Sequence, residues 1–156
     1  MESSQFDEAL FFRRLSESGV RALLIGRRAL VLLGLPVLTS DYDFWIAIDD
    51  AALFNDIAGQ FDLQPTRTPE EARRHGRYTL ENDEHVDVLV ARSVPTIDGQ
   101  IVTFDDLWAR RETVSVAGAD VCLPSIDDLI LTKQFRPSPK DLEDVRLLRI
   151  LKEDRA

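Results

Sequence analysis

The sequence is poor in cysteine, in long apolar runs and in positive charge. Its single cysteine, Cys122, excludes an intramolecular disulfide and a cysteine-based zinc site. The longest apolar stretch, residues 29–38, includes Gly34 and Pro36 and is too short to cross a bilayer. The initial Met-Glu-Ser-Ser-Gln lacks the basic and apolar segments of a signal peptide. We therefore expect a cytoplasmic protein with no membrane partner.

Acidic residues clearly outnumber basic ones. The chain has 28 Asp and Glu against 19 Lys and Arg, which gives a formal net charge of −9 at pH 7. This balance argues against bulk binding to nucleic acid, because such binding depends on neutralising phosphates with Lys and Arg. It is compatible with a nucleotide held through metal ions, since carboxylates are the usual protein ligands of magnesium.

The length and apolar content predict one folded domain over residues 1–156, because 44% of the residues are hydrophobic. Apolar periodicity and turn residues divide the chain into alternating helices and strands. We expect helices over residues 4–18, 27–34 and 49–60, the last capped by Asp49 or Asp50, and strands over residues 20–25 and 42–48. The remainder is expected to form hairpins at 77–90 and 113–123, a polar stretch at 65–76, a short strand and helical turn at 100–109, and two closing helices that begin after Ser125 and Ser138.

Three acidic residues stand out against this pattern. Asp41 and Asp43 are separated by one residue at the start of a predicted strand, so their side chains leave the same face. Two like charges this close repel each other unless a positive charge lies between them, and a divalent cation meets that need. Asp87 lies inside another apolar strand pattern, where an unpaired carboxylate is costly. If the two strands are neighbours, the three carboxylates converge and can hold two magnesium ions for an in-line phosphoryl transfer.

A glycine turn precedes this acidic strand. Gly26 follows the predicted strand 20–25 and precedes the predicted helix 27–34. A glycine at such a turn lets the backbone approach a phosphate closely, and the start of a helix favours an anion. Each feature alone is common, and a solvated acidic pair is the structural alternative for Asp41 and Asp43. Their order along the chain is the one that a nucleotide-transfer site requires.

On these residues the sequence resembles the nucleotidyltransferase superfamily, whose fold is shared by DNA polymerase β and kanamycin nucleotidyltransferase. Within that superfamily it is most similar to AbiEii-type toxin-like proteins and their short bacterial relatives. The likeness covers about residues 15–150 and rests on an ordered motif: Gly26-Arg27, Ala29-Leu30, Gly34, Thr39, Asp41 and Asp43. The C-terminal helix pair of these relatives corresponds to the segments around Lys133 and Asp144.

The resemblance implies an α/β (α+β) fold, with a mixed, mostly antiparallel sheet flanked by helices and a C-terminal helix pair. It implies transfer of a nucleoside monophosphate from a nucleoside triphosphate to a hydroxyl, with release of pyrophosphate. The acceptor stays open between tRNA, protein and a small molecule.

The resemblance also implies residue roles. Three carboxylates would be catalytic and would ligate two Mg²⁺ ions: Asp41, Asp43 and Asp87, the last also helping to deprotonate the acceptor hydroxyl. Four residues would contact the nucleotide: Gly26, Arg27, Thr39 and Lys133. For Lys133 the structural alternative is a solvated helix lysine.

Arg27 departs from the family pattern, which has Gly or Ser at this position. Its guanidinium either pairs with a phosphate, which its fork geometry suits, or lies against Asp41 or Asp43 in place of a metal ion. The second arrangement would give a degenerate, non-catalytic protein that binds a nucleotide or a partner protein. A toxin–antitoxin role follows from family analogy alone.

Positive charge is concentrated in one stretch, at Arg67, Arg73, Arg74 and Arg77. This patch is either a solvated loop or a local contact to a polyphosphate or to an RNA acceptor end.

Overall fold

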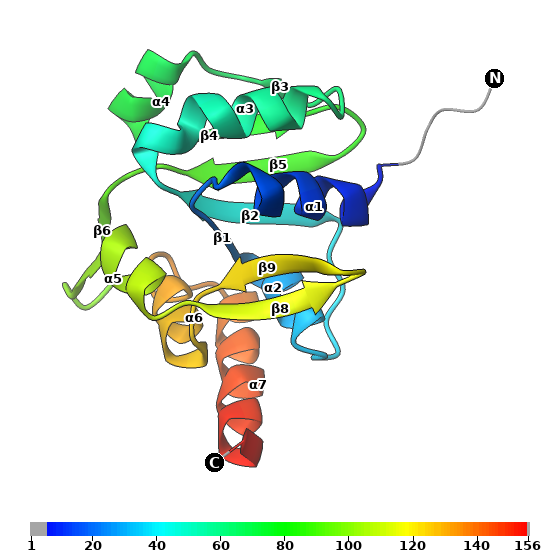
Figure 1. Ribbon diagram of the computed structural model, residues 1–156. Helices are drawn as coiled ribbons and strands as arrows, with labels where there is room; N and C mark the ends of the chain where they lie inside the picture. Colours follow the sequence, from blue (N-terminus) through cyan, green and yellow to red (C-terminus); the bar gives the residue numbers. More distant parts are fainter. Residues whose placement is uncertain (1–5, 156) are drawn as a thin grey trace.

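A five-stranded sheet organises the molecule (Figure 1). The computed structural model describes residues 6–155, so residues 4 and 5 of the predicted first helix, and the ends of the predicted domain, lie outside the described part. The strand order is β1-β2-β5-β4-β3, in which β2 and β5 run parallel and the other neighbours run antiparallel. The strands are β1 (Ala22–Ile25), β2 (Asp41–Ile46), β3 (Gln64–Pro65), β4 (Arg77–Glu81) and β5 (His85–Leu89). The predicted mixed, mostly antiparallel sheet is confirmed.

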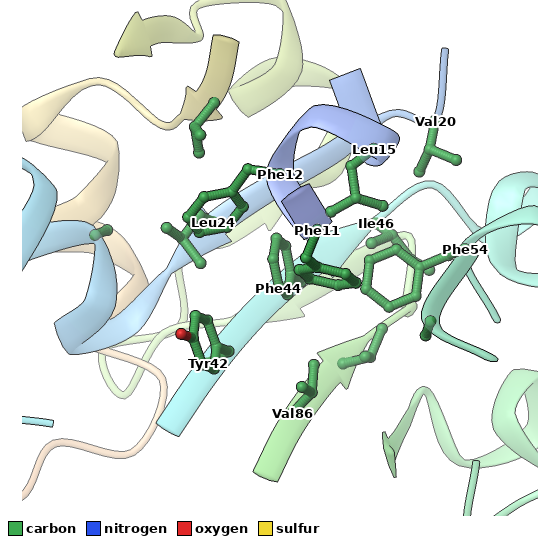
Figure 2. Packing of buried hydrophobic residues seen from close by; sticks show 14 of the residues in the cluster. Phe11, Phe12, Leu15, Val20, Leu24, Tyr42, Phe44, Ile46, Phe54 and Val86 are labelled. Carbon is green, nitrogen blue, oxygen red and sulfur yellow. The ribbon is translucent and has the colours of Figure 1, made fainter. Parts of the chain in front are cut away.

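Helices α1 (Glu8–Ser18) and α3 (Ala51–Gly59) cover one face of this sheet (Figure 1). The alternation of β2 turns Phe44 towards them, and Phe44 and Phe54 meet edge-on with ring centroids 5.3 Å apart. Phe11 of α1 packs on both rings (Figure 2). Fully buried aromatic rings of this kind account for much of the apolar area that the core removes from water.

The opposite face of the sheet carries a second, smaller cluster. Leu23 and Trp45 are fully buried there, and they pack with residues of α5 (Phe104–Ala109). The Trp45 indole nitrogen donates to the Ala91 carbonyl oxygen at 2.8 Å, which satisfies its one polar atom. This cluster covers the face only near the end of β2. Asp43, two residues before Trp45, lies on the same side of the strand.

Helices α2 (Gly26–Leu32), α6 (Ile126–Thr132) and α7 (Pro139–Arg155) lie beside the β1 end of the sheet, and α7 points away from it (Figure 1). The predicted C-terminal helix pair is therefore confirmed as α6 and α7. Ser138 and Asp141 form a reciprocal cap at the start of α7, because each side chain accepts the backbone N–H of the other. No helix within residues 6–155 is long and apolar enough to cross a bilayer.

Several local predictions need correction. The polar stretch 65–76 contains a helix, α4 (Pro69–His75), which begins with a capping box between Thr68 and Glu71. Its sequence lacks an apolar stripe, since Ala72 is its only buried residue, so apolar periodicity could not predict it. Asp50 precedes α3 but does not cap it, because its carboxylate accepts from Arg21 instead.

Two short hairpins and one helical turn complete the structure. The hairpin of β8 (Glu112–Val116) and β9 (Ala119–Leu123) is confirmed, and so is the short strand β7 (Ile101–Thr103) before α5. The partner of β7, β6 (Ser93–Pro95), was not predicted. A single turn, η1 (Ile48–Asp50), leads from β2 into α3.

Candidate active site

Two carboxylates face each other across the parallel strands β2 and β5. Asp43 lies opposite Asp87 in the register, and Asp41 lies opposite His85. Residues at matching positions of adjacent strands point to the same face, so all four side chains share one side of the sheet. The imidazole of His85 lies 3.0 Å from Asp87 Oδ1 through Nε2 and 3.3 Å from Glu81 Oε1 through Nδ1. The two strands are neighbours, so the structure brings Asp43 and Asp87 together on one face of the sheet.

The Asp43 carboxyl is the most perturbed acid of this group. Burial, together with the charge of Asp87 and a hydrogen bond to it, raises the pKa of Asp43 to about 7. Lys133 acts in the opposite direction, while Asp41 adds to the rise. Two carboxylates that face each other in this way keep a proton between them or attract a cation. Near neutral pH the pair is therefore poised between holding a proton and taking up a cation.

The donor set fits a divalent cation best at the Asp43–Asp87 pair. Within residues 6–155, no group of three or more His, Cys, Asp or Glu side chains is arranged to hold a metal ion. Asp41 is exposed at the start of β2, two residues from Asp43 on the same face. Paired oxygen donors with excess negative charge are what a hard cation such as Mg²⁺ prefers. The pair supplies that, and Asp41 lies at its margin.

Gly26 lies directly against Asp43. Its φ of +68° belongs to the left-handed region, which glycine adopts without a steric penalty. A Cβ added to Gly26 would collide with Asp43 Oδ2 and would lie 3.0 Å from Asp43 Cβ. The absence of a side chain at Gly26 therefore lets α2 begin beside the acidic pair.

A groove opens on the Gly26 side of Asp43. We call it the Gly26 groove; its volume is about 540 Å³. It lies between the β1–α2 turn, the segment before β2 and the α6–α7 connection. Its lining consists of Gly26, Arg27, Leu38, Thr39, Ser40, Asp41, Asp43, Lys133, Ser138, Lys140, Asp141 and Asp144. Six of the seven sequence-predicted site residues thus meet in one place, and the seventh, Asp87, lies next to Asp43.

Three buried or half-buried charges join the groove to α7. Asp144 is 1% exposed and Lys133 is 8% exposed. The Lys133 ammonium lies 3.0 Å from Asp144 Oδ2, and Arg27 Nη2 lies 3.1 Å from Asp144 Oδ1. Such a charge is tolerated in the interior only with partners of this kind, so Asp144 anchors both cations to the start of α7.

Arg27 does not lie against Asp41 or Asp43, which was the second of its two expected arrangements. Among the described residues its ion pair is with Asp144, and its Nη1 also donates to the Leu38 carbonyl oxygen at 3.3 Å. It makes no ion pair with Asp41 or Asp43 within residues 6–155. The guanidinium is therefore part of the groove wall and leaves the acidic pair open.

Sequence reasoning assigned no site role to the start of α7. Ser138 and Lys140 lie there and line the groove, although Ser138 was expected only to precede a helix. Their Ser-Pro-Lys sequence is the only local signal, and it indicates a helix start without indicating what that start faces.

A second pocket opens on the opposite side of Asp43. We call it the Asp87 pocket; its volume is about 420 Å³. Asp43 lines both cavities and stands between them. The lining of the Asp87 pocket consists of Ile25, Asp43, Phe44, Thr66, Arg67, Arg77, Tyr78, Thr79, Asp87, Val88, Leu89 and Phe135. Two of the four arginines of the basic stretch, Arg67 and Arg77, therefore line the same pocket as the acidic pair.

Several solved structures resemble the fold of this chain. TM1012 of Thermotoga maritima, assigned as a nucleotidyltransferase, is 18% identical with a TM-score of 0.59, over 92% of this chain and 87% of its own. The chain has a nucleotidyltransferase fold. The lincosamide antibiotic adenylyltransferase LnuA, in a lincomycin-bound structure, is 13% identical with a TM-score of 0.65, over 95% of this chain and 99% of its own. The antibiotic-resistance factor ANT(2'')-Ia is 14% identical with a TM-score of 0.61, over 92% of this chain and 86% of its own.

Sequence comparison alone does not identify the family. No family model matches it, and no curated protein matches it. At identities this low the likeness carries the fold, while the activity has to be argued from the site. The closer likeness to AbiEii-type proteins stays a prediction.

Proposed function

We propose that this protein is a metal-dependent nucleotidyltransferase that moves a nucleoside monophosphate from a nucleoside triphosphate to a hydroxyl acceptor. The observation that carries the proposal is the Asp43–Asp87 pair, in register on adjacent parallel strands and packed against Gly26. Perturbed carboxylates in a cleft are typical of catalytic sites. A nucleotidyltransferase fold around them favours this chemistry over other uses of an acidic pair.

Each side of the site has a task in this proposal. Asp43, Asp87 and Asp41 would hold two Mg²⁺ ions, which would supply positive charge to the reacting phosphate. The triphosphate would lie in the Gly26 groove, where Lys133 and Lys140 provide positive charge. Gly26, which has no side chain, would leave room there for the phosphate oxygens, and Thr39 would contact them. Arg27 holds the groove wall through Asp144.

The transfer itself balances as one in-line displacement. An oxygen of the acceptor hydroxyl attacks the α-phosphorus, and a new phosphorus–oxygen bond forms. The bond from the α-phosphorus to the oxygen that bridges to the β-phosphate breaks, and pyrophosphate leaves with that electron pair. The hydroxyl proton passes to the carboxylate of Asp87, which faces the attacking side and releases it to solvent.

The class of acceptor is open at this stage. The structures of LnuA and ANT(2'')-Ia contain lincomycin and adenylyl-2''-tobramycin, respectively, which are small molecules. These bound molecules favour a small-molecule acceptor over tRNA or protein for this chain as well. A toxin–antitoxin role remains a prediction from family analogy.

The test combines binding and transfer. Calorimetry with ATP, GTP, CTP and UTP, with and without Mg²⁺, should give magnesium-dependent binding of at least one nucleotide. Label from the α-phosphate should then pass to an acceptor, and Asp43→Asn should abolish transfer while the protein stays folded. Asp49→Asn removes an exposed acid outside both cavities and should leave transfer unchanged.

Two results would decide against the enzyme. Absence of magnesium-dependent nucleotide binding would refute the proposal as a whole. Nucleotide binding without transfer to any acceptor would favour the non-catalytic alternative, a protein that uses the same fold to bind a nucleotide or a partner.

A further inference from the structure

The Asp87 pocket lies where an attacking group must come from, if the proposed function holds. In-line displacement places the attacking oxygen opposite the leaving pyrophosphate. The positively charged lysines of the Gly26 groove lie on one side of Asp43, and the Asp87 pocket lies on the other. The hydroxyl of an acceptor alcohol bound in this pocket would therefore lie beside Asp87.

Two arginines give this pocket a positive wall. Arg77 lies opposite Leu89 in the β4–β5 register, on the face that carries Asp87. Arg67 is half-buried, and its Nη1 donates to the Arg77 carbonyl oxygen at 2.8 Å, which holds the two residues together. Neither guanidinium has an ion pair within the described range 6–155. In a chain of net charge −9, two such arginines beside a pocket are free to bind an anion.

The rest of the pocket is apolar with hydroxyl groups at one edge. Leu89 and Phe135 line it, and Phe135 packs edge-on against Trp45 with ring centroids 5.9 Å apart. The hydroxyls of Thr66 and Thr79 lie 2.9 Å from each other on the β4 side. This lining suits a compact apolar body more than an extended polar chain.

We propose that the Asp87 pocket is the acceptor subsite and that Arg67 and Arg77 select a small alcohol that carries one carboxylate or phosphate group. The hydroxyl of this acceptor lies at Asp87, its apolar body lies on Leu89 and Phe135, and its anionic group lies at the two guanidiniums. The volume of about 420 Å³ accommodates a small molecule. The acidic balance of the chain disfavours RNA as the source of the anion.

The test uses alcohols that differ only in charge. They are para-(hydroxymethyl)benzoate, para-(hydroxymethyl)phenyl phosphate, the neutral para-(hydroxymethyl)benzamide and the cationic para-(hydroxymethyl)benzylamine. Binding to the full chain is followed by ligand-observed NMR without nucleotide. The two anions should bind roughly tenfold more tightly than the amide, because each gains a charge-assisted contact. The anion that binds more tightly shows whether the carboxylate or the phosphate is the preferred group.

Matched variants connect the effect to the pocket. Arg77→Gln should remove the preference for the anions. Arg73→Gln removes the same charge from α4, outside the pocket, and should keep the preference. Equal or tighter binding of the amine, or an unchanged preference in Arg77→Gln, would overturn the proposal.

Nucleotide experiments separate this proposal from the proposed function. Magnesium-dependent binding of a nucleotide with label transfer to the amine, or to an RNA 3′-hydroxyl in preference to the anions, would retain the enzyme and overturn the subsite. Binding of the anions at Arg77 without any binding of nucleotide would retain an anion subsite and refute the enzyme, and with it the acceptor role.

Discussion

Replacement of Asp43 by asparagine should stabilise the protein at neutral and alkaline pH. In the folded protein the pKa of Asp43 is raised from 3.8 to about 7, first by burial and then by Asp87. A carboxyl with a raised pKa favours the protonated form in the fold. The unfolded chain ionises first, so the stability of the protein falls as pH rises between these two values, and the loss is complete above pH 7. Asparagine carries no charge and does not suffer this loss.

The magnitude follows from the size of the rise. A change from 3.8 to about 7 corresponds to at most about 4 kcal/mol of unfavourable free energy when Asp43 is ionised. Lys133 and the partial exposure of the pair offset part of this, so we expect a gain of about 1–2 kcal/mol in Asp43→Asn at pH 8. At pH 4 the gain should be close to zero, because the folded wild-type carboxyl is then protonated.

The assay is urea denaturation of both proteins at several pH values. Asp41→Asn is the control, because Asp41 lies on the same strand and face but is exposed. Its stability should stay within about 0.5 kcal/mol of the wild type. A destabilised Asp43→Asn protein at pH 8, or a gain that does not grow with pH, would refute the electrostatic account of this site.

Three further predictions concern the same site. In thermal unfolding, Mg²⁺ at ten times its dissociation constant should stabilise the wild type by about 1.4 kcal/mol and leave the stability of Asp43→Asn unchanged. An equal response of both proteins would contradict metal binding at this pair. Gly26→Ala should lower stability by more than Gly19→Ala. Both glycines have positive φ, but only at position 26 would a Cβ collide with Asp43. Equal losses in urea denaturation would count against this close approach. Lys133→Met should cost about 3 kcal/mol in urea denaturation, because Asp144 loses a buried partner, whereas a loss below 1 kcal/mol would place the ammonium in solvent.

Local patterns predicted most of the framework. The period-two alternation of β2 placed Asp41 and Asp43 on one face, and the hairpin predicted over residues 77–90 is formed by β4 and β5. The start of α7 after Ser138 was also predicted, and Ser138 and Asp141 cap this helix reciprocally. Helix α4 was missed because it buries a single residue, and the Asp50 cap was wrong because Arg21, distant in sequence, takes its carboxylate.

The partners of individual charges could not be predicted. Arg27 pairs with Asp144 across 117 positions of sequence, and Arg67 and Arg77 line a pocket with Asp87. Basic residues in a polar stretch give no periodic signal, so a solvated loop and a binding wall have the same sequence pattern. Which of the two applies depends on the neighbours that the fold supplies.

The sequence by itself determined the order of the acidic residues, the glycine turn and the apolar strands along the chain. These features depend on the geometry of neighbouring residues. Only the tertiary structure decided that Asp43 lies opposite Asp87, with Gly26 against it and a cavity on each side. The physical reason is that strand register, burial and ion pairing arise between segments far apart in the chain, and the same local pattern is compatible with many such pairings.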